Sequence, residues 1–154
     1  DMNQLVANNE KIASMTIADI DQVRVLEDMV AEMEQVEIET WHVLHGGMYT
    51  RTIEIPAGVV LTGALVRVPT VLVVSGDVSV FANGQEVRIT GYSAIPASAN
   101  RKQAFFAIQD TWLTMTFKTD ASTVEEAEIE FAEEAERLMS RRQQATNHIN
   151  ITGE

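Results

Sequence analysis

Residues 70–92 read TVLVVSGDVSVFANGQEVRITGY, two runs of β-branched and aromatic residues separated by Asn83-Gly84. Such runs are typical of β-strands, because these side chains suit a pleated, half-buried surface. Asn and Gly both tolerate a positive φ, so the pair fits a two-residue turn of type I′. This stretch therefore predicts a β-hairpin.

The same pattern continues on both sides of the hairpin, over residues 41–119. Its strand-like segments are MYTRTIEI, VVLTGALVRV, TVLVVSGDVSVF, EVRITGYSAI, KQAFFAI and TWLTMTFKT. The turn signals between and within them are Pro56-Ala57-Gly58, Ser75-Gly76-Asp77, Asn83-Gly84 and Pro96-Ala97-Ser98. Many short strands with no helical pattern between them indicate a β-sandwich or barrel rather than a parallel α/β sheet.

Residues 1–40 form a separate zone, an N-terminal arm and helix. After a polar beginning that predicts no element, a helical pattern runs from Thr16, which suits the N-cap position, to about Glu39. Its apolar residues follow the a, d, a, d spacing of a heptad at Val23, Leu26, Val30 and Met33. This pattern fits a helix that packs on the domain's own core, and it equally fits pairing between two copies of the chain.

Residues 120–154 form the third zone, a C-terminal helix and polar tail. The segment DASTVEEAEIEFAEEAERLMSRR begins with Ser122 and Glu125 at capping-box spacing. Glutamates precede arginines along it, which matches the helix dipole. One apolar stripe contains Val124, Ala127, Phe131, Ala135 and Leu138. The final residues, QQATNHINITGE, are polar, and we expect them to be mobile unless a partner orders them.

The composition excludes several classes of function. The 154 residues contain no cysteine, which removes disulfides, zinc ribbons and iron–sulfur clusters. The net charge is −12, so neither a nucleic acid nor an anionic membrane surface is an expected partner. The acidic residues concentrate in the two helical zones, where a solvated helix face accounts for them. We find neither a membrane-spanning run nor a signal-peptide pattern.

The stretch HGGMYTRTIEIPAGVVLTG, followed by SGDVSVF, a Gly-Tyr turn and QDTWLTMTF, resembles the small cupin-like proteins of tailed bacteriophages. That family has the order His, Gly-x-Tyr-x-Arg, a hydrophobic strand, Ile-Pro-x-Gly and Thr-Gly, and later a glutamate-containing helix similar to residues 122–139. The resemblance spans residues 39–139. It implies a mainly β fold, a cupin-like jelly-roll barrel over residues 41–119, flanked by an N-terminal and a C-terminal α-helix.

Metal-binding members of that family keep histidines just after the Thr-Gly. The positions in this chain that correspond to them are Leu65, Val66, Pro69 and Thr70, none of which is a first-choice ligand for a transition metal. The only alternative ligands are His42 and His45, with Glu54 as a third. Because side chains three residues apart in a strand point to opposite faces, we expect no metal and no cofactor.

A candidate ligand cavity in the barrel combines Tyr49, Arg51, Trp112 and Thr114. Aromatic faces with one guanidinium suit a small polar ligand such as a sugar or nucleotide. The same four residues also fit an ordinary core with an arginine that extends to the surface. The sequence contains no nucleophile elbow, phosphate-binding loop or dinucleotide fingerprint, so we expect no enzyme.

Three functional hypotheses remain. We favour a non-catalytic structural or assembly protein of a phage particle, which forms homo-oligomers and contacts other phage proteins. The expected packing residues are Val23, Leu26, Val30, Met33, Phe131 and Leu138. The second hypothesis is an infection-stage cupin that binds a small molecule or interferes with a host factor, and the third is a metal-dependent cupin enzyme. The expected location is the virion or the cytoplasm of an infected bacterial host.

Overall fold

The structure is a computed structural model that describes residues 11–82 and 84–154. Its helices are α2 (Ile17–Ala31) and α3 (Val124–Phe131), with 3₁₀ turns η1 (Ala135–Arg137) and η2 (Met139–Arg141). Its strands are β1 (Thr40–His45), β2 (Met48–Ile55), β3 (Val60–Thr62), β4 (Leu65–Val66), β5 (Thr70–Ala82), β6 (Gln85–Ala97), β7 (Ala104–Ala107), β8 (Thr111–Lys118), β9 (Ala132–Glu133) and β10 (Asn147–Ile151). The chain is thus mainly β, as the sequence predicts.

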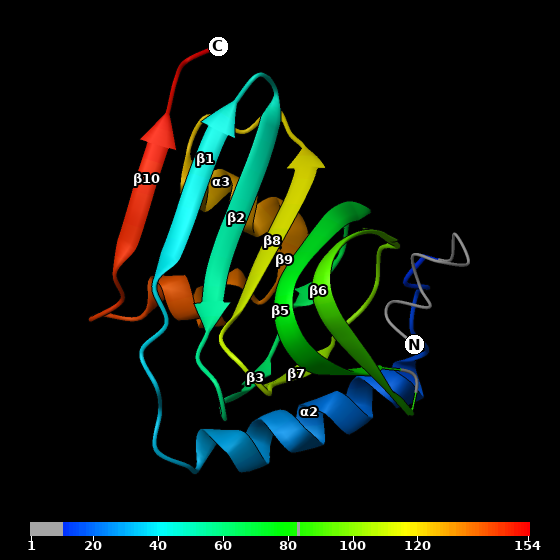
Figure 1. The fold of residues 1–154 in the computed structure, drawn as a ribbon. Coiled ribbons are helices and arrows are strands. Elements are labelled where there is room, and N and C mark those ends of the chain that lie inside the picture. The colour runs from blue at the N-terminus through cyan, green and yellow to red at the C-terminus, as the bar shows by residue number, and fades with distance from the viewer. Residues whose placement is uncertain (1–10, 83) are drawn as a thin grey trace.

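Most of the strands belong to one strongly curled sheet, a half-barrel. Its order is β10-β1-β2-β8-β5-β7-β3, and β6 pairs with β5. Figure 1 shows the flat part of the sheet on the left, the curled β5–β6 hairpin on the right and α2 below β3 and β7. The short β4 and β9 pair separately. The concave side of the half-barrel therefore faces α2 and α3.

The strand registers assign each side chain to one face of the sheet, because successive residues alternate between faces. One row across the concave face contains Thr40, Ile53, Leu113 and Val74, and the next contains His42, Arg51, Met115 and Leu72. The opposite, convex face carries Trp41, Thr52 and Thr114 in one row and Glu54 and Trp112 in another. The concave rows hold the buried residues that matter for the site below.

The β5–β6 hairpin confirms the element predicted from residues 70–92. The two strands pair along their whole length, from Thr70↔Ala97 to Ala82↔Gln85. Gly84 has a φ of +70°, as a type I′ turn requires, while Asn83 lies outside the described residues.

The predicted turn at Ser75-Gly76-Asp77 is wrong, because β5 continues through it. At this point β5 stops pairing with β8 and begins pairing with β7. A Cβ at Gly76 would lie 2.5 Å from Thr111 Oγ1 and 2.7 Å from the Asp110 carbonyl oxygen. The glycine therefore allows a close approach of two chain segments inside a continuous strand.

The N-terminal helix is shorter than the sequence pattern predicts. Thr16 is its N-cap and accepts a hydrogen bond from the Asp19 N–H at 3.2 Å, as expected. The helix ends at Ala31 rather than near Glu39. The following residues run without regular structure toward β1, and Ile38 enters the core.

The C-terminal helix ends after two turns, much earlier than predicted. Its N-cap is Thr123, one residue after the expected Ser122, and the Glu126 carboxylate accepts hydrogen bonds from Ser122. After Phe131 the chain becomes extended in β9, which pairs with β4. Glu134 then has a φ of +59°, which a continuous helix does not allow.

The polar tail is ordered by the domain itself, so the prediction that it needs a partner is wrong. Strand β10 pairs in parallel with β1, from Thr40↔Asn147 to Leu44↔Ile151. Figure 1 shows β10 as the outer edge of the sheet. His148 stacks on Trp41 with ring centroids 5.0 Å apart, and its Nε2 lies 2.9 Å from Glu39 Oε2.

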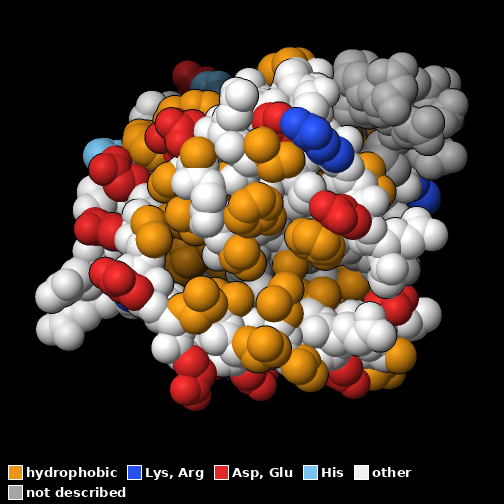
Figure 2. Space-filling model, turned by 60° about the horizontal axis from the view of Figure 1, so that its bottom comes forward, with side chains coloured by type: hydrophobic (Ala, Val, Ile, Leu, Met, Phe, Trp, Pro, Cys, Tyr) orange, Lys and Arg blue, Asp and Glu red, His pale blue; other side chains and the backbone are white. Residues whose placement is uncertain are grey.

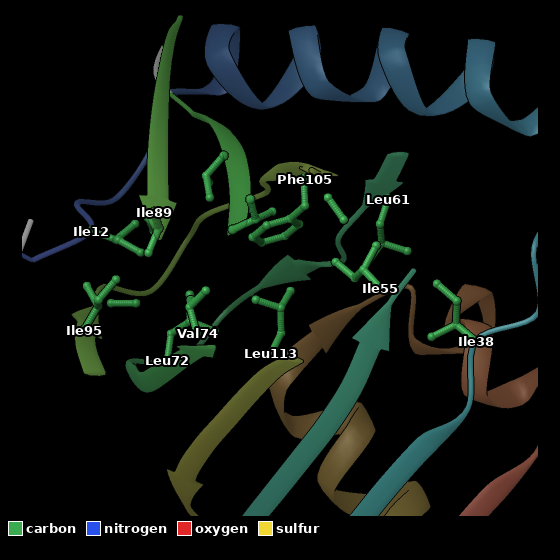
Figure 3. Packing of buried hydrophobic residues seen from close by; sticks show 14 residues of the cluster. Ile12, Ile38, Ile55, Leu61, Leu72, Val74, Ile89, Ile95, Phe105 and Leu113 are labelled. Carbon is green, nitrogen blue, oxygen red and sulfur yellow. The ribbon is translucent and has the colours of Figure 1, made fainter. Parts of the chain in front are cut away.

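The apolar interior is divided into separate clusters. The first, the hairpin cluster, includes Ile55, Leu61, Leu72, Val74, Ile89, Ile95, Phe105 and Leu113. Figure 3 shows these side chains between the strands and α2, together with Ile38 of the same cluster. The second, the α3 cluster, includes Tyr49, Met115, Phe117, Phe131 and Leu138. A third joins Ile20 and Val23 of α2 to Met15 and Ala104.

Candidate functional site

A cavity of about 450 Å³ lies between the hairpin cluster and the α3 cluster. Its apolar wall includes Ile53, Leu61, Leu72, Phe105, Leu113, Met115 and Phe131. Its lining includes exposed residues at the end of α2, just after that helix and in the segment after α3, namely Ala31, Met33 and Glu134, so the mouth lies between these segments. Figure 2 shows this side of the molecule, where hydrophobic side chains surround a hollow. The volume lies within the range of small-molecule sites.

Arg51 brings a positive charge to the cavity wall from the concave face of β2. Its guanidinium lies 5.4 Å from the centroid of the Phe131 ring and is 2.9 Å from Glu128 Oε2. Glu128, which is 2% exposed, also pairs with Arg141 at 2.8 Å and accepts a hydrogen bond from Ser140 Oγ at 2.5 Å. One buried carboxylate therefore faces two guanidinium groups, and one positive charge is left over.

The charge of Glu128 is stabilised by these neighbours. Burial alone would raise its pKa, because an apolar environment disfavours the ionised form. The hydrogen bonds from Ser140 and Arg141 and the positive charge of Arg51 outweigh burial and lower the pKa. The carboxylate is thus ionised at neutral pH.

His42 extends this polar network to the C-terminal strand. The Asn147 Nδ2 donates to the Ser140 carbonyl at 2.9 Å, which turns the Asn147 Oδ1 toward His42 Nε2, 2.6 Å away. His42 Nε2 must then carry the proton, and Nδ1 accepts from the Tyr49 hydroxyl at 2.7 Å. Burial, together with the charge of Arg51, lowers the pKa of His42, so the imidazole is neutral at pH 7.

Thr40 is the one buried side chain in the described part of the chain whose polar atom has no hydrogen-bond partner. It is 1% exposed, it lines the cavity, and it lies on the concave face, diagonal to Arg51 across the β1–β2 pair. Buried hydroxyls are normally paired, since an unpaired one costs free energy. This hydroxyl therefore marks a position where a further partner would be stabilising.

The charged residues around the cavity differ in sign from the chain as a whole. Six Lys and Arg side chains line it, namely Arg24, Arg51, Arg101, Lys102, Arg137 and Arg142, against Glu27, Glu34, Glu133 and Glu134. The lining therefore has a net charge of +2, whereas the chain carries −12. The lining is therefore less repulsive to an anion than the net charge of the chain suggests.

Two of these cations are buried but differ in their partners. Lys102 Nζ pairs with Glu27 Oε2 at 2.9 Å, so its charge is compensated. Arg101, which is 2% exposed, donates to the Ser98 carbonyl and to Thr70 Oγ1, and it forms no ion pair with any described residue. Burial lowers the pKa of Arg101 to about 10, and the guanidinium still stays charged at neutral pH.

The four residues of the predicted ligand cavity do not converge. Tyr49 and Arg51 lie on the concave face, where Arg51 lines the cavity and Tyr49 is fully buried beside it. Trp112 and Thr114 lie on the convex face, where Trp112 packs against Trp41 at 5.4 Å between ring centroids. Paired residues share a face, and Trp112 pairs with Glu54 and Thr114 with Thr52. Trp112 and Thr114 therefore lie on the face opposite to Tyr49 and Arg51.

The three candidate metal ligands do not converge, because His42 lies on the concave face, while His45 and Glu54 lie on the convex face at opposite ends of the β1–β2 pair. His42 is buried in the network described above, and His45 Nδ1 lies 2.7 Å from Thr152 Oγ1 at the surface. Glu54 lies on the convex face beside Trp112. Among the described residues, no group of three or more His, Asp or Glu side chains is arranged to hold a metal ion.

The six expected packing residues are divided between the interior and the surface. Val23, Leu26 and Val30 face the molecule, as the hypothesis of a helix packed on its own core requires, whereas Met33 is exposed. Phe131 and Leu138 are buried in the α3 cluster. These two side chains are therefore not available for a contact between copies.

The sequence analysis did not identify Thr40, Glu128 or Arg101 as site residues. Glu128 belongs to a run of seven glutamates in α3 and the segment that follows, and the apolar stripe of the predicted helix gives no reason to choose it. Thr40 and Arg101 stand in segments without a motif. The position of Arg101 depends on its contact with Thr70, 31 residues earlier, and that of Thr40 on the pairing of β1 with β2.

No family model and no curated protein matches this chain. Among solved structures, KdgF from Halomonas sp. is matched with 20% identity over 57% of this chain and 86% of that chain, at a TM-score of 0.46. A cupin superfamily protein from Desulfitobacterium hafniense is matched with 9% identity over 60% and 88%, at 0.45. A conserved protein of unknown function from Streptococcus pyogenes is matched with 13% identity over 57% and 79%, at 0.43. At these scores the likeness carries no argument, and the half-barrel described above rests on its own strand pairing.

Within residues 11–82 and 84–154, none of the helices has the length and apolar character needed to cross a membrane.

Proposed function

We propose that this protein is a non-catalytic binding protein that holds a small, largely apolar molecule in the cavity of its half-barrel. The observation that supports it is the cavity itself, about 450 Å³, which separates two apolar clusters that would otherwise form one core. A ligand with an apolar body would contact both clusters and would remove their surface from water.

The absence of a converging catalytic set in the sequence favours binding without chemistry. His42, the one histidine near the cavity, already uses both ring nitrogens in contacts with Tyr49 and Asn147. The resemblance to tailed-phage cupin-like proteins suggests the setting: a product made in an infected bacterial cell, where it sequesters a metabolite or interferes with a host factor.

Nile red, a neutral apolar dye, tests the proposal directly. We expect saturable binding of one dye per chain, with the blue-shifted emission of an apolar environment. Ala31→Trp places a large side chain at the cavity mouth and should weaken binding at least tenfold. Ala18→Trp is the matched control, since Ala18 is an exposed residue of the same helix that does not line the cavity. Equal binding by both variants would refute the proposal.

A second candidate function is assembly of a phage particle through contacts between copies. It is favoured by an apolar stripe on the outer side of α2, where Ile17, Val25 and Met29 recur at multiples of four residues and are exposed. These residues differ from the expected heptad positions, because Val23 and Leu26 are used inside the molecule.

Analytical ultracentrifugation tests this second candidate. If the stripe joins two copies, the wild-type protein sediments as a dimer and Met29→Lys as a monomer, because a charge at the centre of an apolar contact is costly. Asp28→Asn is the control, because it changes the charge by the same amount at an exposed position of the same helix about 100° away from Met29, and it should leave the dimer intact. Two results together would exclude this candidate. The wild-type protein would stay monomeric over a 100-fold range of concentration, and mass spectrometry would not detect it in purified particles.

A further inference from the structure

We infer that the cavity ligand carries a single carboxylate or similar monoanionic head group, held by Thr40 and Arg51, on an apolar body. This inference rests on the proposed function and adds the class of ligand. It follows from the unpaired Thr40 hydroxyl, from the apolar wall, and from Arg51, which lines the cavity and shares the single carboxylate of Glu128 with Arg141.

The first element of the head-group site is Arg51. A guanidinium has five N–H groups, and Arg51 uses three of them within the described residues, for Tyr49, Glu128 and Ser140. Because Glu128 is shared with Arg141, its negative charge does not neutralise both arginines. An anionic group at the cavity wall would accept from the remaining N–H groups and balance the excess charge.

The second element is Thr40. Thr40 and Arg51 are diagonal neighbours on the concave face, a spacing at which long side chains on adjacent strands reach each other's partners. Rotation of χ1 between its staggered positions exchanges the Thr40 hydroxyl with its methyl group, so the hydroxyl can turn toward the cavity. There it would donate to one oxygen of a carboxylate while Arg51 donates to the other.

The third element is the wall beyond these two residues. Ile53, Leu72, Leu113 and Met115 continue the two concave rows from Thr40 and Arg51 toward the middle of the sheet. Arg101 lines the cavity beside Thr70, the first residue of β5, which is three strands from β1, and so belongs to a different part of the wall. A ligand with its head at Thr40 and Arg51 therefore places its body among aliphatic side chains.

The test compares octanoate with 1-octanol, which have the same chain length and differ in the head group. Isothermal titration calorimetry on the wild-type protein should give at least tenfold tighter binding of octanoate, since hydrogen bonds to a charged group are the stronger ones. If Nile red and 1-octanol bind and octanoate has no advantage, the head-group inference fails and the proposed function stands. If none of the three binds, both fail.

Substitutions at Thr40 locate the head group. Thr40→Val keeps the shape of the side chain and removes the hydroxyl, so the preference for octanoate should fall about tenfold. Thr40→Ser retains the hydroxyl and should retain the preference. Thr114→Val is the matched control on the convex face and should change nothing. A preference that survives in Thr40→Val would overturn the assignment of this residue.

A separate measurement shows that any loss of binding by Thr40→Val is not a loss of folding. The hydroxyl has no partner in the unliganded protein, so its removal should raise the urea midpoint of unfolding rather than lower it. A variant that is more stable and binds octanoate less well would identify Thr40 as a residue that serves a ligand. A lowered midpoint would show that the hydroxyl already has a stabilising partner, which contradicts the inference.

Discussion

Glu128 is the residue on which the polar side of the cavity depends. Its carboxylate holds Arg51 and Arg141 in place and is almost completely buried. Removal of the negative charge leaves two guanidinium groups facing each other across a neutral amide. Removal of one partner of a buried ion pair strongly lowers the free energy of unfolding, because the remaining buried charge is no longer compensated.

We therefore expect Glu128→Gln to lower the free energy of unfolding at pH 7 by about 3 kcal/mol. The pKa of Glu128 is lowered in the folded protein, so its contribution is complete above the ordinary carboxyl pKa. That contribution disappears as the pH falls through the lowered folded value. The difference between wild type and variant, measured by urea unfolding, should therefore shrink below about pH 4.5.

Glu136→Gln provides the control for this experiment, since Glu136 is exposed on η1. Its effect should remain within about 0.5 kcal/mol at every pH, as for most surface substitutions. A difference for Glu128→Gln that grows on acidification would contradict the assignment of a lowered pKa.

At the scale of the elements, the sequence predicted which helices and strands form better than it predicted where they end. Alternation and turn residues were sufficient for the β5–β6 hairpin and for the mainly β class. The end of α3 was missed because the stripe from Val124 to Leu138 has helical spacing throughout. What interrupts the helix is the pairing of Ala132 and Glu133 with β4, a tertiary contact that overrides local propensity.

The same limit applies to Gly76 and to the tail. A glycine between two polar residues is typical of a turn, but the approach of Thr111 to Gly76 is visible only once β5 and β8 are paired. Residues 147–151 have the polar composition of a mobile tail, and their strand forms because β1 offers a free edge. Neither the close contact at Gly76 nor the formation of β10 can be predicted from the local sequence.

The N-cap of α3 gives a prediction at this scale. Thr123→Ala should lower the free energy of unfolding by about 1 kcal/mol, because the Thr123 hydroxyl accepts from the Glu126 N–H. Ser122→Ala keeps that cap and the Ser122 backbone bond to the Glu126 carboxylate, so its cost should be smaller. Chemical denaturation of both variants distinguishes them, and a larger loss for Ser122→Ala would favour the cap predicted from sequence.

At the scale of the whole molecule, a cavity lies between the hairpin cluster and the α3 cluster. The composition indicates how much apolar surface the chain can bury. It does not predict whether the buried side chains pack against one another or leave a cavity. Here residues of the hairpin cluster, the α3 cluster and α2 line one cavity. A bound apolar molecule would connect them.

Octanoate should therefore stabilise the folded chain as a whole. At a concentration 100 times its dissociation constant, we expect the free energy of unfolding to rise by about 2.7 kcal/mol, without a change in the denaturant slope. Acetate, with the same charge and no chain, is the control and should have little effect. Equal shifts with acetate and octanoate would indicate a general ionic effect instead of occupation of the cavity.

The parallel pair of β1 and β10 has a consequence for biosynthesis. The polar bonds of this pair join residues about a hundred positions apart, as in His42 with Asn147, 105 positions later. At the usual speed of translation, roughly 5 to 20 s separate the appearance of the two strands at the ribosome. During that interval the nascent chain presents an unsatisfied strand edge beside Trp41. Cellular factors that bind exposed edges would find their target here, before the last strand emerges and covers it.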